Sequence, residues 1–315
     1  MKQFMISCFL FFGSAAAFAQ DYIPYYNLVN EAEYWLYKED YNKAKQLYLK
    51  AFALEKPMSK DVFLLAKCYA FEGNKVACLH WLEVSTTTLP SAAPYLLRKA
   101  SQYPVFQTIF PENGELEAFI QDLLLLKEVT NKKYKDSTYQ MLQDSVYTLC
   151  QQDQIYRKQG DLSHFTGEDW RLFNQNDSIV QTALFNLSQK YGYPGFPHVG
   201  TDLGDLILVH VSDKKMYQAY KTLLYEAIKK GHILPFGYAY MVDRWELHQS
   251  KSCYLFMRIY TRKLCKDVDY EAVVKRRLAI GLSIYFNGSR KKATESYDLL
   301  PWVNDAFLEA HSLLD

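Results

Sequence analysis

The sequence lacks an excess of charge of either sign. Lysine and arginine total 36 and aspartate and glutamate total 35, so the formal net charge is only +1. A protein that binds the phosphates of a nucleic acid carries a basic field, and none is encoded here. The short basic runs NKKYK and SRKK are typical of a solvated surface. We therefore expect no nucleic-acid partner.

Cysteine is sparse, and its spacing does not fit a disulfide scaffold. Five cysteines follow the first nineteen residues, at positions 68, 78, 150, 253 and 265, and none forms a CxxC pair. Because five is odd, at least one of them has no intramolecular partner. We expect them to be small buried hydrophobic residues. A bridge between Cys253 and Cys265 stays open as an alternative.

Motifs for metals and for phosphate-bearing cofactors are also missing. The histidines, at positions 80, 164, 198, 210, 232, 248 and 311, form no HExxH motif or comparable ligand spacing. The string GYPGFPHVG is rich in glycine but lacks the lysine and the hydroxyl residue of a phosphate-binding loop. It is more typical of a rigid turn between helices. We therefore expect no metal and no cofactor.

An apolar run is present only at the start of the chain. Lys2 precedes an apolar stretch from Phe4 to Phe12, and Ala17 and Ala19 fit an A-x-A cleavage site. This pattern predicts a signal peptide over residues 1–19, and hence export to the periplasm or the exterior. A membrane anchor is the competing interpretation, but the run is about half the roughly 20 residues that a spanning helix needs. We expect no membrane span in the mature chain.

The first hundred residues contain an internal repeat. The string AEYWLYKEDYNKAKQLYLKAFALEKP (32–57) aligns with AKCYAFEGNKVACLHWLEVSTTTLPS (66–91). Pairs of corresponding residues are 34 positions apart: Ala32 and Ala66, Trp35 and Tyr69, Ala44 and Cys78, Tyr48 and Leu82, Ala51 and Ser85. The small residues predict closely packed antiparallel helices, and the large aromatic ones predict the filling between them. Residues 22–95 therefore resemble two tetratricopeptide repeats, whose period is 34 residues.

The repeat departs from the family pattern at Glu39, where glycine is common. A generic pair of helical hairpins is the alternative interpretation. Two repeats leave an apolar face uncovered, so residues 96–136 are expected to supply connecting and capping helices. Because arrays of this kind present a concave helical surface, the resemblance implies a protein or peptide partner for this region.

The second half predicts further helices. Apolar residues return every three or four positions in residues 137–160 and in the strings NDSIVQTALFNLSQKYG, GDLILVHVSD, MYQAYKTLLYEAIKKG, FGYAYMVDRWELH, AVVKRRLAIGL and WVNDAFLEAHSLL. The 26 tyrosines and 19 phenylalanines favour large contacts between helices. We predict an all-α fold, with a helical domain over 137–288 and a C-terminal helix over 289–315. A β-strand in DLILVHV is the alternative at that segment.

Residues 140–285 resemble a bacterial helical domain of unknown function. Its pattern reads Asp-Gln-x-x-Arg, Gly-Trp-Pro, Gln-His-Ala-Asp, Asp-Arg and Arg-Arg-x-x-x-Gly-Leu. The positions that match it here are Asp153, Gln154, Arg157, Gly192, Pro194, Gly200, His210, Asp243, Arg244, Arg277, Gly281 and Leu282. Val209 replaces the glutamine, and Ser212 or Asp213 must replace the aspartate. The string CYLFM stands where the family has Tyr-Gly-Thr-Gln.

Five residues in these motifs are candidates for a catalytic site: His210, Asp153, Arg157, Asp243 and Arg244. In a hydrolase, His210 is the general base, an aspartate orients it, and an arginine holds an anionic group of the substrate. The alternative makes His210 a core histidine with a carboxylate partner, and Asp153 and Arg157 an i, i+4 ion pair. If Arg157 meets Asp243, both motifs form one buried network with His210.

The sequence thus predicts an exported tetratricopeptide-like protein that binds a protein or a ligand. The hydrolase is the alternative function. The binding function predicts a bare concave groove lined by the first helices of the repeats, and the hydrolase predicts that the five candidates meet around an open cavity.

Overall fold

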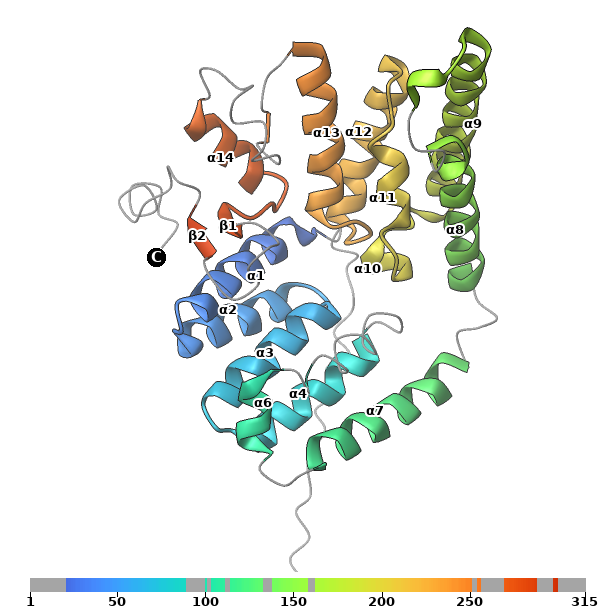
Figure 1. The fold of residues 1–315 in the computed structure, drawn as a ribbon. Helices are drawn as coiled ribbons and strands as arrows, with labels where there is room; N and C mark the ends of the chain where they lie inside the picture. Colours follow the sequence, from blue (N-terminus) through green and yellow to red (C-terminus); the bar gives the residue numbers. More distant parts are fainter. Residues whose placement is uncertain are drawn as a thin grey trace, which may run out of the picture.

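The computed structural model confirms the predicted all-α class (Figure 1). It describes residues 21–88, 100, 103–110, 114–132, 138–157, 162–250, 254–255, 269–287 and 297–299. Apart from helices, this part of the chain contains one short antiparallel pair of strands, β1 (Tyr285–Asn287) and β2 (Tyr297–Leu299). The predicted signal peptide and the possible Cys253–Cys265 bridge fall outside these ranges.

The first four helices form two hairpins in tandem: α1 (Tyr22–Tyr37) with α2 (Tyr41–Leu54), and α3 (Ser59–Phe71) with α4 (Lys75–Thr88). The predicted small residues Ala32 and Ala44 are fully buried at the contact between α1 and α2. Tyr48 is also fully buried, and Trp35 and Phe52 pack against the same core. The residue types of the repeat therefore have the packing roles that the sequence predicts.

The two hairpin turns have the same hydrogen bonds, shifted by 34 residues. Asp40 N donates to Trp35 O, and Asn74 N donates to Tyr69 O. Each turn then ends on a helix cap. The Oδ1 atoms of Asp40 and Asn74 accept from the backbone N–H three residues ahead, at 3.0 and 3.1 Å. These side chains satisfy backbone donors at the start of α2 and α4, so both second helices begin at equivalent positions.

Two helices pack against the second hairpin. They are α6 (Pro104–Ile109) and α7 (Glu115–Lys132). Phe106, Leu116 and Ile120 are buried in a second hydrophobic core with Phe63 of α3 and Leu82 of α4. The last hairpin therefore does not leave its apolar face in water.

The rest of the described chain is a helical assembly. Its helices are α8 (Thr138–Arg157), η1 (Leu162–His164), α9 (Gly167–Tyr191), α10 (Phe196–Val199), α11 (Leu203–Leu208), α12 (Lys214–Lys229), α13 (Pro235–Ser250) and α14 (Tyr270–Leu278). The start of α9 is fixed by a capping box, in which Thr166 and Asp169 satisfy each other's backbone donors. Its end is fixed by Gly192, which has a φ of 83°.

Two sequence predictions need correction. The segment DLILVHV forms no strand. The helix predicted there, α11, ends at Leu208, earlier than expected, and His210 lies in the turn after it. The predicted C-terminal helix over 289–315 is wrong at residues 297–299, because β2 pairs there with β1. The apolar string at 302–314 lies outside the described residues.

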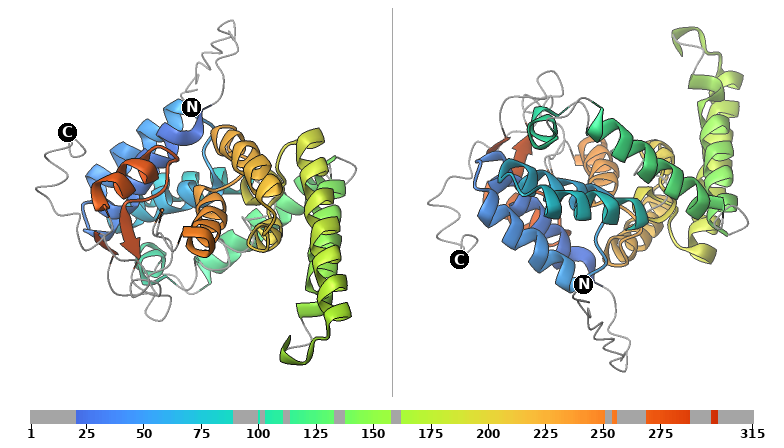
Figure 2. Two further views of the ribbon diagram at one scale, coloured as in Figure 1. Left: turned by 90° about the horizontal axis from the view of Figure 1, so that it is seen from above. Right: turned by 90° about the horizontal axis from the view of Figure 1, so that it is seen from below.

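The hairpins and the C-terminal helices share one hydrophobic core. It contains Tyr22, Tyr25 and Tyr26 of α1 together with Tyr217 and Tyr220 of α12. Figure 2 shows α8 and α9 side by side at one edge of the molecule and the first four helices at the opposite edge, with α12 and α13 between them. The face of α1 that points away from α2 is therefore covered by the second half of the chain.

Candidate functional site

Three of the five candidate residues meet at the junction of α8, α9 and the turn after α11. Arg157 donates through Nε to His210 Nε2 at 3.2 Å, and His210 Nδ1 lies 3.1 Å from Asp153 Oδ1. The predicted i, i+4 pair is present, since Arg157 NH1 lies 3.5 Å from Asp153 Oδ1. The candidates from the first and third motifs therefore form one polar cluster.

Asp177 of α9 belongs to this cluster and is not among the sequence candidates. Both of its carboxylate oxygens accept from Arg157, through NH1 and NH2, at 2.8 Å each. Arg157 also lies 4.5 Å from the centroid of the Phe173 ring. This two-point ion pair holds the guanidinium plane in one orientation. The end of α8 is thereby fixed to α9.

The imidazole of His210 has both ring nitrogens engaged. Arg157 is only a donor, so Nε2 must accept and the ring hydrogen lies on Nδ1, facing Asp153. Gln181 Nε2 additionally donates to the backbone O of His210 at 3.1 Å. The lone pair that a general base would use is therefore occupied by Arg157. In this arrangement His210 links three helical segments.

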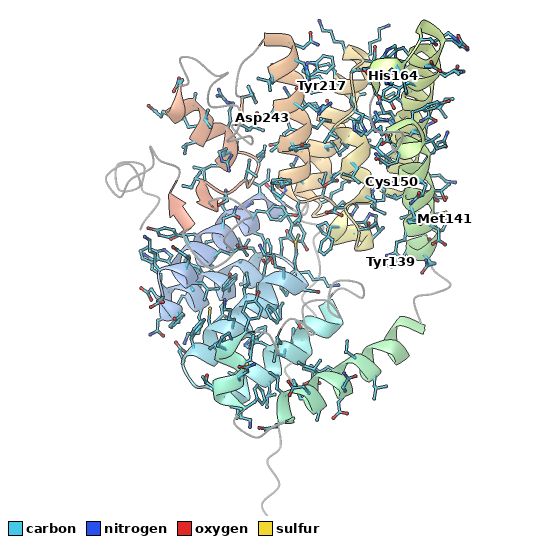
Figure 3. All side chains as sticks on the ribbon, in the orientation of Figure 1. Tyr139, Met141, Cys150, His164, Tyr217 and Asp243 are labelled. Carbon is cyan, nitrogen blue, oxygen red and sulfur yellow. The ribbon has the colours of Figure 1, made fainter. Side chains whose placement is uncertain are left out.

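Asp243 and Arg244 lie elsewhere, on α13. The contacts of Arg157, His210 and Asp153 include neither residue, so the suggested pairing of Arg157 with Asp243 is wrong. Figure 3 shows Asp243 on the side of α13 nearer α14, away from the labelled Cys150 of α8. The five candidates thus do not meet around one cavity.

Asp243 belongs to a buried site with Arg277 of α14. Its Oδ1 accepts from Leu255 N at 2.5 Å, and its charge counteracts the burial that lowers the pKa of Arg277 to about 10. Arg277 donates to the carbonyls of Leu255 and Ser283. Two of the family-like motifs therefore meet here, and their charged groups secure the segment after α14.

The largest apolar-walled space among the cavities described here is a cleft between the two halves. This interhelical cleft has a volume of about 350 Å³. Its walls come from the first helices of both hairpins, α1 and α3, from α10 and the start of α13, and from residues 281–283. The side chains are mostly apolar, and Phe236 at the start of α13 is 53% exposed. A cavity of this size with mostly apolar walls is typical of a ligand site.

Asp61 is the buried acid of the interhelical cleft. Its carboxylate is in the first turn of α3, and the residue is 4% exposed. Tyr25 donates its hydroxyl to Asp61 Oδ2 at 2.6 Å and accepts from Met58 N at 2.9 Å. Burial raises the pKa of Asp61 to about 6, because it outweighs the opposing charge of Lys60. The charge of Glu33 also acts to raise this pKa, and the hydrogen bond from Tyr25 acts to lower it. Burial thus disfavours the ionised form of this carboxyl, and the hydrogen bond from Tyr25 fixes its position.

A second pocket adjoins the interhelical cleft and contains another acid. Its volume is about 240 Å³, and it shares Phe196, Leu234 and Phe236 with the cleft. Asp205 of α11 lines it and accepts the Tyr193 hydroxyl at 2.8 Å. A Cβ atom at Gly237 of α13 would overlap Asp205 Oδ2, so glycine permits this close approach. Burial raises the pKa of Asp205 to about 7.

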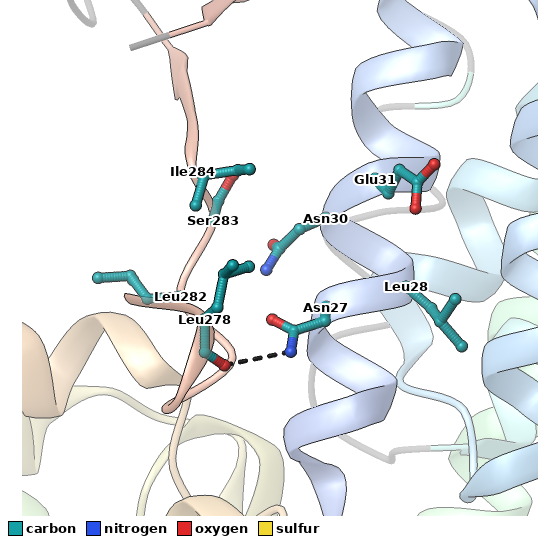
Figure 4. A pocket seen from close by; sticks show the side chains of 8 residues that line it. All are labelled: Asn27, Leu28, Asn30, Glu31, Leu278, Leu282, Ser283 and Ile284. Atoms are coloured by element: carbon teal, nitrogen blue, oxygen red, sulfur yellow. Dashed lines mark hydrogen bonds between the residues drawn. The ribbon is translucent and has the colours of Figure 1, made fainter. Parts of the chain in front are cut away.

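The face of α1 beside the cleft is tied to the chain after α14. Asn27 donates to Leu278 O at 3.1 Å and Asn30 donates to Gly281 O at 3.0 Å. Figure 4 shows both asparagines pointing toward this segment across a small pocket of about 90 Å³. Tyr26 of the same helix donates to Ile233 O, in the turn between α12 and α13, at 3.1 Å. The predicted bare groove along the first helices is therefore partly covered.

The described residues contain no group of three or more His, Cys, Asp or Glu side chains arranged to hold a metal ion. Cys68, Cys78 and Cys150 are buried, as the sequence predicts. No helix within the described ranges is long and apolar enough to cross a membrane. The chain matches no protein-family model, no curated protein and no solved structure.

Proposed function

We propose that the chain is an exported binding protein of the tetratricopeptide type, and that it holds a segment of a partner protein in the interhelical cleft. The observation that carries the proposal is the cleft itself. It is a space of about 350 Å³ with mostly apolar walls, and the first helices of both hairpins contribute to it. Those helices line the concave binding surface of such arrays.

The repeated turn supports the assignment of the hairpins to tetratricopeptide repeats. The backbone bonds from Asp40 to Trp35 and from Asn74 to Tyr69, and the caps that follow them, recur after 34 residues. This is the period of that family. The partly covered face of α1 differs from an open array, and it makes the binding site a cleft between two halves instead of a long groove.

Export is part of the proposal and rests on the residue pattern at positions 1–19. Asp21 accepts from Ile23 N at 3.0 Å and caps α1. Cleavage after Ala19 would therefore leave the first helix and its cap intact. Expression of the full chain in a bacterium tests this point. We expect the mass of the protein in the periplasm or medium to correspond to a chain that begins at Gln20, and an uncleaved cytoplasmic product would contradict export.

The hydrolase alternative is not favoured by the geometry. A general base needs a free lone pair within reach of a proton, and His210 Nε2 already accepts from Arg157. Asp153 and Asp177, which are 0% and 7% exposed, are bound to the same guanidinium. We therefore treat this cluster as an ion-pair network that joins α8, α9 and α11.

Selection from a library of displayed random peptides tests the binding function. We expect enriched peptides to bind the mature chain with micromolar affinity and to lose binding when Phe236 is replaced by alanine. Phe236→Ala removes an exposed side chain, so the fold should survive, and a thermal melt checks this. Trp170→Ala is the matched control, because Trp170 is an exposed aromatic residue of α9 that does not line the cleft. If the selected peptides bind the Phe236→Ala variant as tightly as the original chain, the proposal is contradicted.

A further inference from the structure

The interhelical cleft and its adjoining pocket carry an excess of negative charge. The described residues that line them include the carboxylates of Glu33, Asp61, Asp202 and Asp205, and one cation, Lys60. Lys60 Nζ pairs with Glu33 at 2.5 Å. The three aspartates form no ion pair with the described part of the chain. An unpaired cluster of this kind attracts a cation.

Asp61 has an oxygen available to a ligand. Oδ2 accepts from Tyr25, while Oδ1 accepts no hydrogen bond from the described residues. The side chain is more than nine-tenths buried and lines the cleft. A buried carboxylate with an open acceptor position is unfavourable unless a donor reaches it. Tyr25 thus holds one oxygen of a carboxylate that lines the cleft, and the other oxygen can accept from a ligand.

Apolar side chains line the interhelical cleft and the adjoining pocket. Phe196, Leu234 and Phe236 line both the interhelical cleft and the adjoining pocket, and Val29 and Leu282 line the cleft. Phe236 is stacked on Tyr240, with the ring centroids 6.1 Å apart, and remains largely exposed. A ligand group in the cleft therefore contacts apolar side chains as well as the Asp61 carboxylate.

We infer that the interhelical cleft receives a lysine or arginine side chain of the partner segment, with its methylene stem on Phe196, Leu234 and Phe236 and its cationic head at Asp61. This inference rests on the proposed function. Lysine and arginine combine a long apolar stem with a terminal donor, which matches a cleft lined by both apolar side chains and a carboxylate. Their charge also offsets the cost of burying the Asp61 carboxylate.

Other side chains fit this environment less well. A purely apolar side chain fills the cleft but leaves Asp61 Oδ1 without a donor, so part of the desolvation cost stays unrelieved. An acidic side chain is repelled by Asp61, Asp202 and Asp205. The arrangement therefore selects for positive charge at one position of the partner and tolerates variation around it.

Three synthetic peptides of the form Ac-Ala-Phe-X-Phe-Ala-NH₂ test the inference, with lysine, norleucine or glutamate at X. Norleucine keeps the stem of lysine and removes its charge. Titration calorimetry on the mature chain should give an affinity about tenfold higher for lysine than for norleucine, and lower still for glutamate. Asp61→Asn should remove the preference for lysine, because an amide keeps the bond with Tyr25 but carries no charge.

Controls separate this inference from the proposed function. Asp122→Asn replaces an exposed carboxylate of α7 and should leave the lysine preference unchanged. If all three peptides bind equally and Phe236→Ala abolishes binding, the cleft is a peptide site but the inference is wrong. If no peptide binding depends on Phe236, both are overturned. Phenethylamine is a further probe: binding as tight as that of the lysine peptide would overturn the assignment to a peptide side chain.

Discussion

Glu39 and Gly73 occupy the same left-handed position in the two hairpin turns, with φ angles of 63° and 71°. A left-handed conformation costs an L-residue roughly 1–2 kcal/mol, whereas glycine adopts it readily. The first turn therefore keeps its geometry although it lacks the favourable residue. The helix pair and the Asp40 cap that follow the turn hold Glu39 in place.

Glu39→Gly should stabilise the protein. We expect the free energy of unfolding to rise by about 1 kcal/mol, because the strain at φ 63° disappears. Urea denaturation followed by circular dichroism measures the change. Gly73→Glu is the matched control and should lower the free energy by a similar amount. Equal stability of both variants and the original chain would show that the left-handed position carries no strain in either turn.

Arg157→Lys should destabilise the protein in spite of the retained charge. A lysine cannot make the two parallel bonds to Asp177 or the bond to His210, so we expect a loss of about 2 kcal/mol. Arg171→Lys is the control, since Arg171 pairs with Glu168 on the exposed face of α9. Its effect should be close to zero. A small effect at Arg157 would mean that the ion-pair network does not hold α8 to α9.

Gly237→Ala should displace Asp205. The new Cβ atom meets the Asp205 carboxylate and the Ile233 side chain, so we expect a loss of about 1–3 kcal/mol in thermal or urea unfolding. Gly167→Ala provides the comparison, because nothing lies within 4 Å of its Cβ position at the start of α9. That substitution should be neutral or slightly stabilising. Equal effects at the two glycines would argue against the close contact at Gly237.

Stability should respond to pH through Asp61. Its pKa rises from 3.8 to about 6 on folding, so the folded chain holds the proton more tightly than the unfolded chain. The contribution of Asp61 to the free energy of unfolding is therefore complete below about pH 4 and is lost as the pH rises to 6. Asp61→Asn does not titrate. The stability of the variant relative to the original chain should increase over this window, by on the order of 2 kcal/mol.

Urea midpoints at several pH values for both proteins give this difference. The pKa of His232 is lowered to about 4, mainly by burial, and His232 therefore contributes in the opposite direction between about pH 4 and 6.5. Its contribution, like that of Asp205, is the same in both proteins and cancels in the comparison. A constant difference across the window would mean that the Asp61 carboxyl is not held in a buried environment.

The helices follow from local sequence patterns, and the repeat period locates the hairpins. The helix α9 starts at Gly167, nine positions before the string at Asn176 that predicts it, because the Thr166 capping box fixes an earlier start. The i, i+4 spacing of Asp153 and Arg157 predicts their ion pair correctly. Interactions within one helix are thus visible in the sequence.

Long-range partners are not visible in the same way. Asp177 is 20 positions from Arg157, and only the packing of α8 on α9 brings them together. Asp61 looks like an ordinary acid in the first turn of a helix, and its burial depends on α1, through Tyr25. Gly237 gives one usable signal for the cleft, since a glycine inside a helical pattern often marks a close contact.

The bonds from Asn27 and Asn30 to the chain after α14 also constrain the order of assembly. Each bridges 251 positions, so α1 finds these partners only after the chain through Gly281 has been made. Contacts of such separation form late in folding. This face of α1 must therefore stay uncovered until residues 278–281 have been made, and the cleft is complete only after that.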